Sequence, residues 1–421
     1  MHPLTDTALP ALAAALDCEA MRCALAGALG CRANAIAECA IERVKYRPGR
    51  SALVLYRVAA GEAGPSRETL VYATVYPAGT TLRVFPDDRK LPGLRLLGDA
   101  GRLRGTLLPE VVRSRWGAVL EPQRCTVSRV SYFPEHAYTA RVDVGLGEGR
   151  DWALYAKTQF TARGARTFAA LQRLWQTRAS REAHLRHARP VLYQETVSTL
   201  WQEGLSGSTL EALATQGRLD PMLALRVGEA VAELHGVADI DALESRDTRT
   251  CVARLHEVLG VLGAVLPELA ARVRNVVERL ESCAPQDEAA AVTLHGDLHL
   301  NNILVDSGGV GLVDLDDLCR GPAELELGSF VAALLYRALL HGERADADEA
   351  VAPFLEGYQA GARRPISAPH VRWHAAAALI HERAWRCLTS LKPGRLELVQ
   401  ELVGLAEALA GQRRSSSELA A

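Results

Sequence analysis

The fold of this chain is decided by the stretch Leu294-His295-Gly296-Asp297-Leu298-His299-Leu300-Asn301-Asn302-Ile303-Leu304-Val305 and its continuation Asp306-Ser307-Gly308-Gly309-Val310-Gly311-Leu312-Val313-Asp314. Its two apolar runs flank a Ser-Gly-Gly turn, which predicts an antiparallel hairpin. In such a hairpin the first residue of one strand lies near the last residue of the other, so we expect Asn302 and Asp314 to come together. An amide oxygen beside a carboxylate suits a hard divalent cation.

Asp297 precedes Asn302 by five residues, on the loop that enters the hairpin. His-x-Asp-x-x-x-x-Asn is the spacing of a kinase catalytic loop, in which the Asp orients a substrate hydroxyl and the Asn and a later Asp hold magnesium. Phosphoryl transfer needs in-line positioning and neutralised phosphate charge, which carboxylates and metal ligands supply. We therefore predict Asp297 as the catalytic residue and Asn302 and Asp314 as metal ligands. The alternative, a polar turn beside an ordinary hairpin, does not explain why two of only four asparagines are adjacent.

The hairpin and its entry loop resemble the aminoglycoside phosphotransferase-like kinases. Three further segments resemble that family: the interlobe hinge at 199–207, the helix end at 232–235, and the stretch 321–328 after the metal-binding Asp. The resemblance covers roughly 126–400 and implies an α+β, two-lobed protein-kinase-like fold. That fold has a small antiparallel β lobe and a large helical lobe, and here it carries an N-terminal extension.

The resemblance also implies a function. We expect phosphoryl transfer, dependent on ATP or GTP and assisted by Mg²⁺, to a hydroxyl of a small molecule. The main chain of Gln202, Glu203 and Leu205 would contact the nucleotide base. Two alternatives stay open: a kinase acting on a peptide or protein that docks on the N-terminal extension, and a non-catalytic nucleotide-binding pseudokinase scaffold.

Lys157 is the predicted phosphate-binding cation. It ends the third strand of the β half, where the kinase lysine stands, and it is one of four lysines among 44 arginines. A compact ammonium fits between phosphates as a point charge, which a planar guanidinium does not match. Three features depart from the family. The following helix contains no glutamate, Glu182 being the nearest later one; no glycine-rich loop is present; and Glu326 stands where the family usually has Asp.

Two segments of the β half resemble each other. Val44-Lys45-Tyr46-Arg47-Pro48 matches Val130-Ser131-Tyr132-Phe133-Pro134, and Val71-Tyr72-Ala73-Thr74 matches Leu154-Tyr155-Ala156-Lys157. The similarity favours an internal duplication. We predict that both segments form the same order of strands, and that only the second keeps the lysine.

The remaining pattern predicts three parts: an N-terminal extension over 1–125, an N-lobe over 126–204 and a helical C-lobe over 205–421. Within them we expect helices at 8–43, 163–175, 210–219, 221–235, 251–282 and 325–411, strands at 51–58, 69–76, 191–192 and 199–202, and a loop-rich segment at 77–110.

Composition limits the classes of function. The 421 residues are 48% hydrophobic and 23% charged, which is typical of a globular chain of two or three lobes. A net charge of −2 and 5% aromatic residues argue against nucleic acid as a partner. No apolar run approaches the roughly 20 residues that span a bilayer, so we expect no membrane contact. Residues 1–30 lack a basic leader, and nine cysteines form no C-x-x-C pair, so we expect a cytoplasmic protein.

Overall fold

The computed structural model describes residues 6–61, 67–117, 120–147, 150–160, 163–179, 185–238, 240, 243–286, 290–342 and 344–411. The chain divides into two compact units. Unit 1 comprises Met1–Gly164, Val191–Glu203 and Cys387–Leu396, and unit 2 comprises Ala165–Pro190, Gly204–Arg386 and Glu397–Ala421. The boundary expected at 125/126 therefore lies inside unit 1, and the elements on either side of it belong together.

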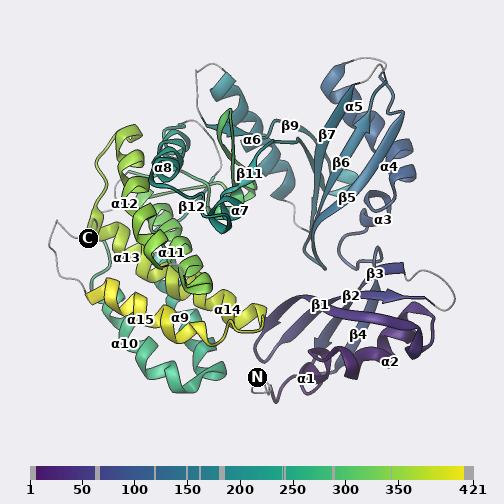
Figure 1. Cartoon of the computed structure of the whole chain (residues 1–421), viewed down its shortest axis with the longest axis horizontal. Helices are drawn as coiled ribbons and strands as arrows, with labels where there is room; N and C mark the ends of the chain where they lie inside the picture. The colour runs from purple at the N-terminus through teal and green to yellow at the C-terminus, as the bar shows by residue number, and fades with distance from the viewer. Residues whose placement is uncertain are drawn as a thin grey trace. The chain divides into compact units, whose positions relative to one another are not determined.

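The first part of unit 1 is a four-stranded antiparallel meander with helices against one face (Figure 1). Its elements are α1 (Leu12–Ala15), α2 (Cys18–Leu29), β1 (Ile36–Arg47), β2 (Ser51–Ala60), β3 (Arg67–Tyr76) and β4 (Gly79–Val84). The Tyr56 hydroxyl, from the middle of β2, donates to the Ala15 carbonyl at the end of α1. This bond ties the helical layer to the sheet.

Two predictions for this region were wrong. The helix expected over 8–43 ends at Leu29, and Ile36–Arg47 forms β1, because pairing along the whole of β2 outweighs the helix propensity of its alanines. The segment 77–110, expected to be loop-rich, contains β4 and short helices. Its glycines and prolines separate these elements and do not abolish them.

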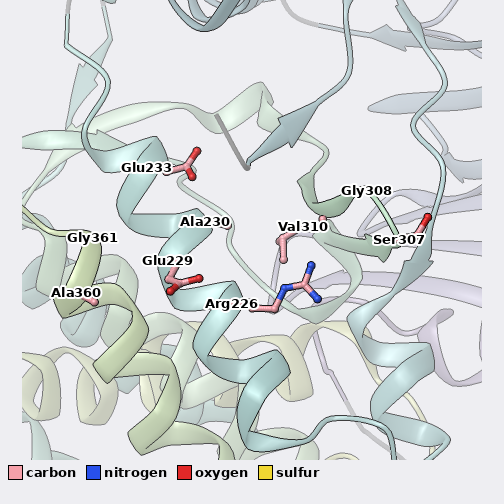
Figure 2. Close-up of a pocket in the computed structure, with 10 residues that line it drawn as sticks. Arg226, Glu229, Ala230, Glu233, Ser307, Gly308, Val310, Ala360 and Gly361 are labelled. Carbon is pink, nitrogen blue, oxygen red and sulfur yellow. The ribbon is translucent and has the colours of Figure 1, made fainter. Parts of the chain in front are cut away.

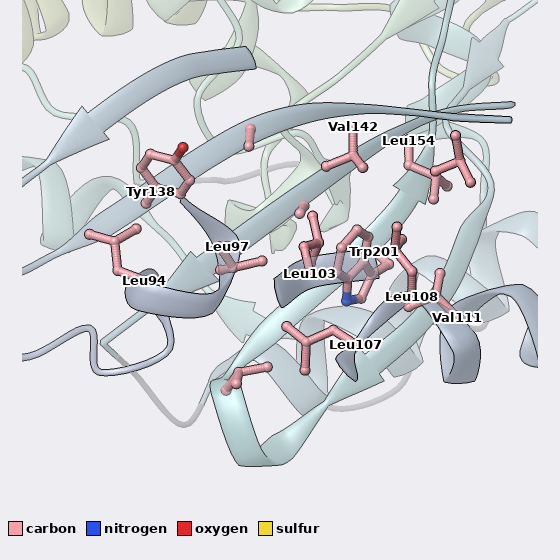
Figure 3. Close-up of a cluster of buried hydrophobic side chains, with 14 of the residues drawn as sticks. Leu94, Leu97, Leu103, Leu107, Leu108, Val111, Tyr138, Val142, Leu154 and Trp201 are labelled. Atoms are coloured by element: carbon pink, nitrogen blue, oxygen red, sulfur yellow. The ribbon is translucent and has the colours of Figure 1, made fainter. Parts of the chain in front are cut away.

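The second part of unit 1 is a five-stranded sheet in the order β5-β6-β7-β10-β9. Its elements are α3 (Leu94–Leu97), α4 (Ala100–Thr106), α5 (Leu108–Trp116), β5 (Arg124–Phe133), β6 (Ala137–Gly145), β7 (Asp151–Gln159), β9 (Pro190–Gln194) and β10 (Thr199–Glu203). Figure 3 shows leucines of α3–α5 directed at the sheet around the fully buried Trp201. The Trp201 indole N–H donates to the Gln194 side chain, so this large buried ring also has its polar atom satisfied.

The predicted similarity of the two sheets is confirmed at the level of strand order and register. Both begin with three consecutive antiparallel strands, and Thr74 and Lys157 occupy equivalent positions in the third strand, opposite Leu53 and Thr139. The first turn of each has three residues, Pro48–Arg50 and Pro134–His136. The middle residue of each turn has a positive φ, +67° at Gly49 and +58° at Glu135.

The repeat also extends to the helices, which the sequence comparison of the strands missed. Asp6-Thr7-Ala8-Leu9-Pro10-Ala11-Leu12 precedes α1, and Asp88-Arg89-Lys90-Leu91-Pro92-Gly93-Leu94 precedes α3. Asp17 and Asp99, each eleven positions after the first Asp, cap the helices that follow, α2 and α4. The second copy then carries an insertion of four residues before its strands, which shifts the spacing from 82 to 86.

One carboxylate joins helix and turn in each copy. Asp6 Oδ2 accepts the Tyr46 hydroxyl and the Gly49 N–H, both at 2.8 Å. Asp88 Oδ2 accepts the Tyr132 hydroxyl and the Glu135 N–H, also at 2.8 Å. Asp88 is buried and its other oxygen accepts two more backbone N–H groups, from residues 90 and 91. In each copy the carboxylate therefore binds the N–H of the positive-φ residue of the turn. In the second copy that residue is Glu135, which lacks the conformational freedom of glycine.

Unit 2 is helical and contains two small sheets, β11-β14-β15-β8 and β12-β16-β13. Its helices are α6 (Arg163–Ala179), whose first residues belong to unit 1, α7 (Leu210–Thr215), α8 (Pro221–His235), α9 (Thr248–Val265), α10 (Ala270–Ser282), α11 (Ala323–His341), α12 (Arg344–Gly361), α13 (Ala368–Ala378), α14 (Trp385–Ser390), whose residues after Arg386 belong to unit 1, and α15 (Leu398–Gly411). Its strands are β8 (Arg186–His187), β11 (Ser208–Thr209), β12 (Glu244–Ser245), β13 (Val292–Leu294), β14 (Ile303–Asp306), β15 (Gly309–Leu312) and β16 (Cys319–Gly321). The hairpin and the helices at 163–175 and 221–235 were predicted correctly.

Helices α8 and α12 cross with their backbones almost in contact. A Cβ at Gly228 would lie 2.0 Å from the Phe354 carbonyl oxygen, and one at Gly357 would lie 2.0 Å from the Leu225 carbonyl oxygen. Only glycine allows this approach from each side. No helix in the described ranges is both long and apolar enough to cross a membrane.

The first prediction concerns the Asp88 carboxylate. Asp88→Ala leaves the Tyr132 hydroxyl and buried N–H groups without a partner, so we expect the free energy of unfolding to fall by about 3 kcal/mol. The matched change Asp6→Ala removes the equivalent but more exposed carboxylate and should cost about 1 kcal/mol. Urea denaturation followed by fluorescence measures both. Equal losses would show that burial does not distinguish the two copies.

Candidate active site

Asn302 lies directly before β14 and Asp314 shortly after β15, so both stand at the open end of the hairpin. Ile303 is paired with Leu312 in the register of β14 and β15, and the Val313 N–H donates to the Asn302 carbonyl at 3.0 Å. Asp314 follows directly and has a left-handed backbone, φ +62° and ψ +45°. The predicted proximity of these two residues is therefore present in the backbone pairing.

The Asn302 side chain connects the hairpin to the loop that carries Asp297. Its Nδ2 donates to the Asp297 carbonyl at 3.0 Å, and the Asn302 N–H donates to the His299 carbonyl at 2.8 Å. Asn302 is buried. Because the amide nitrogen is used by the loop, the amide oxygen is the atom left to bind a cation.

Both histidines of the loop have tautomers fixed by their partners. His295 Nε2 donates to the Val313 carbonyl at 2.9 Å, which leaves Nδ1 to accept the Asp297 N–H at 3.4 Å. His299 Nδ1 accepts the Asn301 N–H at 3.2 Å, so Nε2 carries the proton and lies 3.7 Å from Asp297 Oδ2. Burial lowers the pKa of His299 to about 4, with Arg386 and Arg383 acting in the same direction and Asp297 opposing. This imidazole is therefore neutral near pH 7.

A buried carboxylate accepts hydrogen bonds from the backbone of the catalytic loop. Glu326, in the first turns of α11, accepts the His295 N–H at 3.0 Å and the Gly296 N–H at 2.7 Å, one on each oxygen. His235, at the end of α8, donates to the same carboxylate at 2.9 Å, and its Nδ1 lies 2.9 Å from the Tyr358 hydroxyl of α12. Burial raises the pKa of Glu326, but these partners outweigh it and hold the pKa below its ordinary value. Sequence reasoning identified Glu326 only as a longer substitute for the usual Asp.

The turn before Asp297 requires glycine. Gly296 has φ +83°, and a Cβ there would lie 2.0 Å from the Asp317 carbonyl oxygen. Arg246 donates to the Gly296 carbonyl at 2.6 Å. Both backbone groups of Gly296 are thus satisfied, and the loop is pressed against the segment that follows Asp314.

Sequence reasoning missed the arginine that contacts Asp297. Arg386 Nη2 donates to Asp297 Oδ1 at 2.9 Å, 89 residues away along the chain. Burial raises the pKa of Asp297, while the charges of Arg386, His299, His295 and Arg383 lower it and prevail, so Asp297 is a carboxylate at neutral pH. No pattern in the sequence links the two positions; only the packing of α13 and α14 brings them together.

The other predicted site residues are distributed over both units. Lys157 lies near the end of β7, half-buried, between Thr139 of β6 and Leu200 of β10. Gln202 and Glu203 end β10, and the Glu203 carboxylate pairs with Arg115. Leu205 belongs to unit 2, where it packs on Gly311 of the hairpin. Glu182, the later acidic candidate for pairing with Lys157, lies outside the described residues.

A pocket of about 520 Å³ lies at the other end of the hairpin, as Figure 2 shows. It is lined by Arg226, Glu229, Ala230, Glu233, Ser307, Gly308, Gly309, Val310, Ala360 and Gly361. These residues belong to α8, the hairpin turn and the end of α12. The strands separate this turn from Asn302 and Asp314 by roughly 13 Å, so the pocket is distinct from the candidate catalytic residues.

The described residues contain no group of three or more His, Cys, Asp or Glu side chains placed to hold a metal ion. The donors at the hairpin are one carboxylate and one amide. A cation there would need further oxygen ligands, such as those of phosphates and water.

Comparison with known proteins gives one family match. The model of the "Phosphotransferase enzyme family" matches residues 156–370. None of the curated proteins compared with the chain matches it. The match spans the lysine strand, the catalytic loop, the hairpin and α11.

Several solved structures are similar to this chain at low sequence identity. A spectinomycin phosphotransferase in complex with ADP and spectinomycin has 13% identity and a TM-score of 0.50, over 75% of this chain and 99% of its own. A choline/ethanolamine kinase family protein from Mesorhizobium loti has 14% identity and a TM-score of 0.48, over 75% and 98%. A thermostable aminoglycoside phosphotransferase mutant with AMP-PNP and hygromycin B has 15% identity and a TM-score of 0.47, over 73% and 98%. The first of these supports the two-lobed kinase-like fold, an antiparallel β lobe with a helical lobe.

The second prediction concerns Glu326. Glu326→Asp shortens the side chain, so it should no longer reach His235 and both loop N–H groups at once. We expect a loss of about 2 kcal/mol in unfolding free energy and faster amide exchange in the peptide covering 294–300. Glu324→Asp is the matched control, because Glu324 is buried in the same turn but bonds the Ser367 N–H at 3.0 Å. Faster exchange of the loop in both variants would contradict a specific role for Glu326.

Proposed function

The chain belongs to the phosphotransferase enzyme family, and on that premise we propose that it transfers the γ-phosphoryl group of ATP or GTP, with Mg²⁺, to a hydroxyl of a small molecule. The observation that carries the proposal is the arrangement of Asp297, Asn302 and Asp314 around the hairpin, held by one hydrogen-bond network. Support for the nucleotide comes from similar folds: one similar protein was crystallised with ADP and another with AMP-PNP.

Asp297 has the contacts expected of a group that orients a hydroxyl and takes its proton. Its Oδ1 accepts a hydrogen bond from Arg386, whereas Oδ2 lies 3.7 Å from His299 Nε2. In the proposed step the acceptor oxygen bonds to the γ-phosphorus while the bond from that phosphorus to the β,γ-bridging oxygen breaks. The nucleoside diphosphate leaves, and the hydroxyl proton passes to Asp297 Oδ2.

The residues of the hairpin fit a magnesium ion. The Asp314 carboxylate and the Asn302 amide oxygen are hard oxygen donors, and the bond from Asn302 Nδ2 to the Asp297 carbonyl fixes which end of the amide faces outward. When bound, Mg²⁺ would neutralise charge on the phosphate oxygens. The chain itself positions the ligands and the carboxylate that receives the proton.

Lys157 is proposed to bind the α- and β-phosphates, and the main chain of Gln202, Glu203 and Leu205 to contact the base. The register supports the first assignment, because Lys157 replaces the neutral Thr74 of the first copy at the same position of the third strand. Helix α6 contains no glutamate that could pair with this lysine. A neutral residue in the first copy fits a repeat that keeps its structure without a phosphate site.

The third prediction tests catalysis. With radiolabelled ATP or GTP, Mg²⁺ and a panel of small hydroxyl compounds, Asp297→Asn and Asp314→Ala should each lower labelled product by at least about 10³-fold. Asp151→Asn, an exposed carboxylate of β7, is the control and should retain full transfer. A parent protein that binds nucleotide but gives no product, with either variant indistinguishable from it, would favour a non-catalytic scaffold. Label found only on added peptides would favour a protein kinase.

The fourth prediction tests Lys157. Lys157→Arg should weaken binding of a fluorescent ATP analogue by about tenfold or more, because a planar guanidinium does not fit between phosphates as the compact ammonium does. Lys392→Arg, at an exposed position of unit 1, should bind as the parent does. Parental affinity in Lys157→Arg would remove this lysine from the nucleotide site.

A further inference from the structure

The helix that carries Arg386 is interrupted by a π-helical turn. Residues Leu379–Ala384 form this turn between α13 and α14, with no break in the chain of helical residues. Such turns are rare, and they occur frequently at functional sites because the extra residue redirects the side chains that follow. Here the side chain one turn further on is Arg386, which reaches the catalytic carboxylate.

The other charges of the π-helical turn compensate one another. The Arg383 guanidinium is 4% exposed, lies 3.3 Å from the Glu382 carboxylate and donates to the Ser329 carbonyl at 3.2 Å. Glu382 also accepts the Ser329 hydroxyl at 2.8 Å. These contacts belong to the core of unit 2. Arg386, in contrast, is a charged residue of this segment whose side chain is half exposed.

The ion pair between Arg386 and Asp297 is of a different kind. One donor meets one oxygen, and the side chains are 50% and 39% exposed. A half-exposed, single-donor pair contributes little to stability. It also occupies one oxygen of the group that must receive the acceptor. The fold does not need this pair, so its position at the catalytic residue calls for a functional explanation.

From this geometry we propose that Arg386 recognises the acceptor, and that the acceptor carries an oxyanion, a carboxylate or a phosphate, next to the hydroxyl that is phosphorylated. A hydroxyl bonded to Asp297 Oδ2 lies within roughly 6 Å of the Arg386 guanidinium. An acceptor oxyanion that close to the hydroxyl can reach the Arg386 guanidinium and accept two hydrogen bonds from it. Arg386 then releases Asp297 Oδ1. An ammonium group there is repelled by Arg386. The inference rests on the proposed function and specifies its substrate class.

The test uses a microbial metabolite extract separated by ion exchange into anionic, neutral and cationic fractions. Each fraction is incubated with the full chain, Mg²⁺ and γ-labelled ATP or GTP, and labelled products other than inorganic phosphate are counted after subtraction of the Asp297→Asn reaction. We expect product from the anionic fraction. Loss of that product after phosphatase treatment of the fraction would identify a phosphate acceptor, and its persistence a carboxylate. Product from the cationic or neutral fraction alone overturns the inference, whereas no product from any fraction overturns the proposed function itself.

Variants of Arg386 then separate recognition from support of Asp297. With the active fraction, Arg386→Ala should raise the half-saturating amount of acceptor at least tenfold, a larger change than any fall in kcat, and leave the KM for nucleotide within about twofold. Arg386→Lys should give an intermediate value, because it keeps the charge and loses the fork. Arg363→Ala, an exposed arginine beyond α12, should match the parent. A lower kcat in Arg386→Ala with unchanged acceptor saturation would show that Arg386 only positions Asp297, and would overturn the proposal.

Discussion

The buried carboxylate of Glu326 is the constraint on which the arrangement of unit 2 depends. A carboxylate that is 2% exposed is costly unless its oxygens are hydrogen-bonded, and here two backbone N–H groups and an imidazole supply those bonds. The imidazole belongs to His235 and is itself bonded to Tyr358, so one hydrogen-bond network around this charge joins α8, α11 and α12. The catalytic loop is held by its backbone. The Asp297 side chain takes no part in these bonds, whereas Gly296, His295 and Asn302 are all needed for the loop geometry.

In unit 1 a carboxylate also accepts backbone N–H groups, and this arrangement occurs twice. In each copy an aspartate before a short helix accepts a tyrosine hydroxyl and the N–H of the positive-φ residue in the first hairpin turn. The first copy has Gly49 there and the second has Glu135, which carries a strain that glycine would not. The buried Asp88, with four donors, fixes this turn more firmly than Asp6 does. Glu135 in turn pairs with Arg89 at 2.7 Å, so the side chain that replaced glycine gained a partner of its own.

How far the sequence alone could predict this structure depends on the range of the interactions. The hairpin, Asn302 beside Asp314, and helices such as α8 follow from local periodicity and turn residues, and these were predicted. β1 was not, because its alanines favour a helix until β2 supplies a partner strand. The helical part of the repeat carries a clear signal, Asp-x-x-Leu-Pro-x-Leu, that a comparison restricted to the strands did not include. The four-residue insertion that changes the spacing between copies also conceals it.

The contacts of Arg386 could not be predicted from the sequence. They also differ in kind from those of the charged residues that are buried in unit 2. Two buried charges in unit 2 have a nearby polar partner: Glu326 is bonded to the His235 imidazole, and Arg383 is paired with Glu382. Such pairs are required by desolvation, whatever the protein does. The pair of Arg386 with Asp297 is partly exposed, at 50% and 39% of the two side chains, so its contribution to stability is small. A π-helical turn, which costs regular hydrogen bonding, nevertheless directs this arginine to the catalytic carboxylate. A contact that the fold maintains without a stability requirement is best explained by the molecule that binds there.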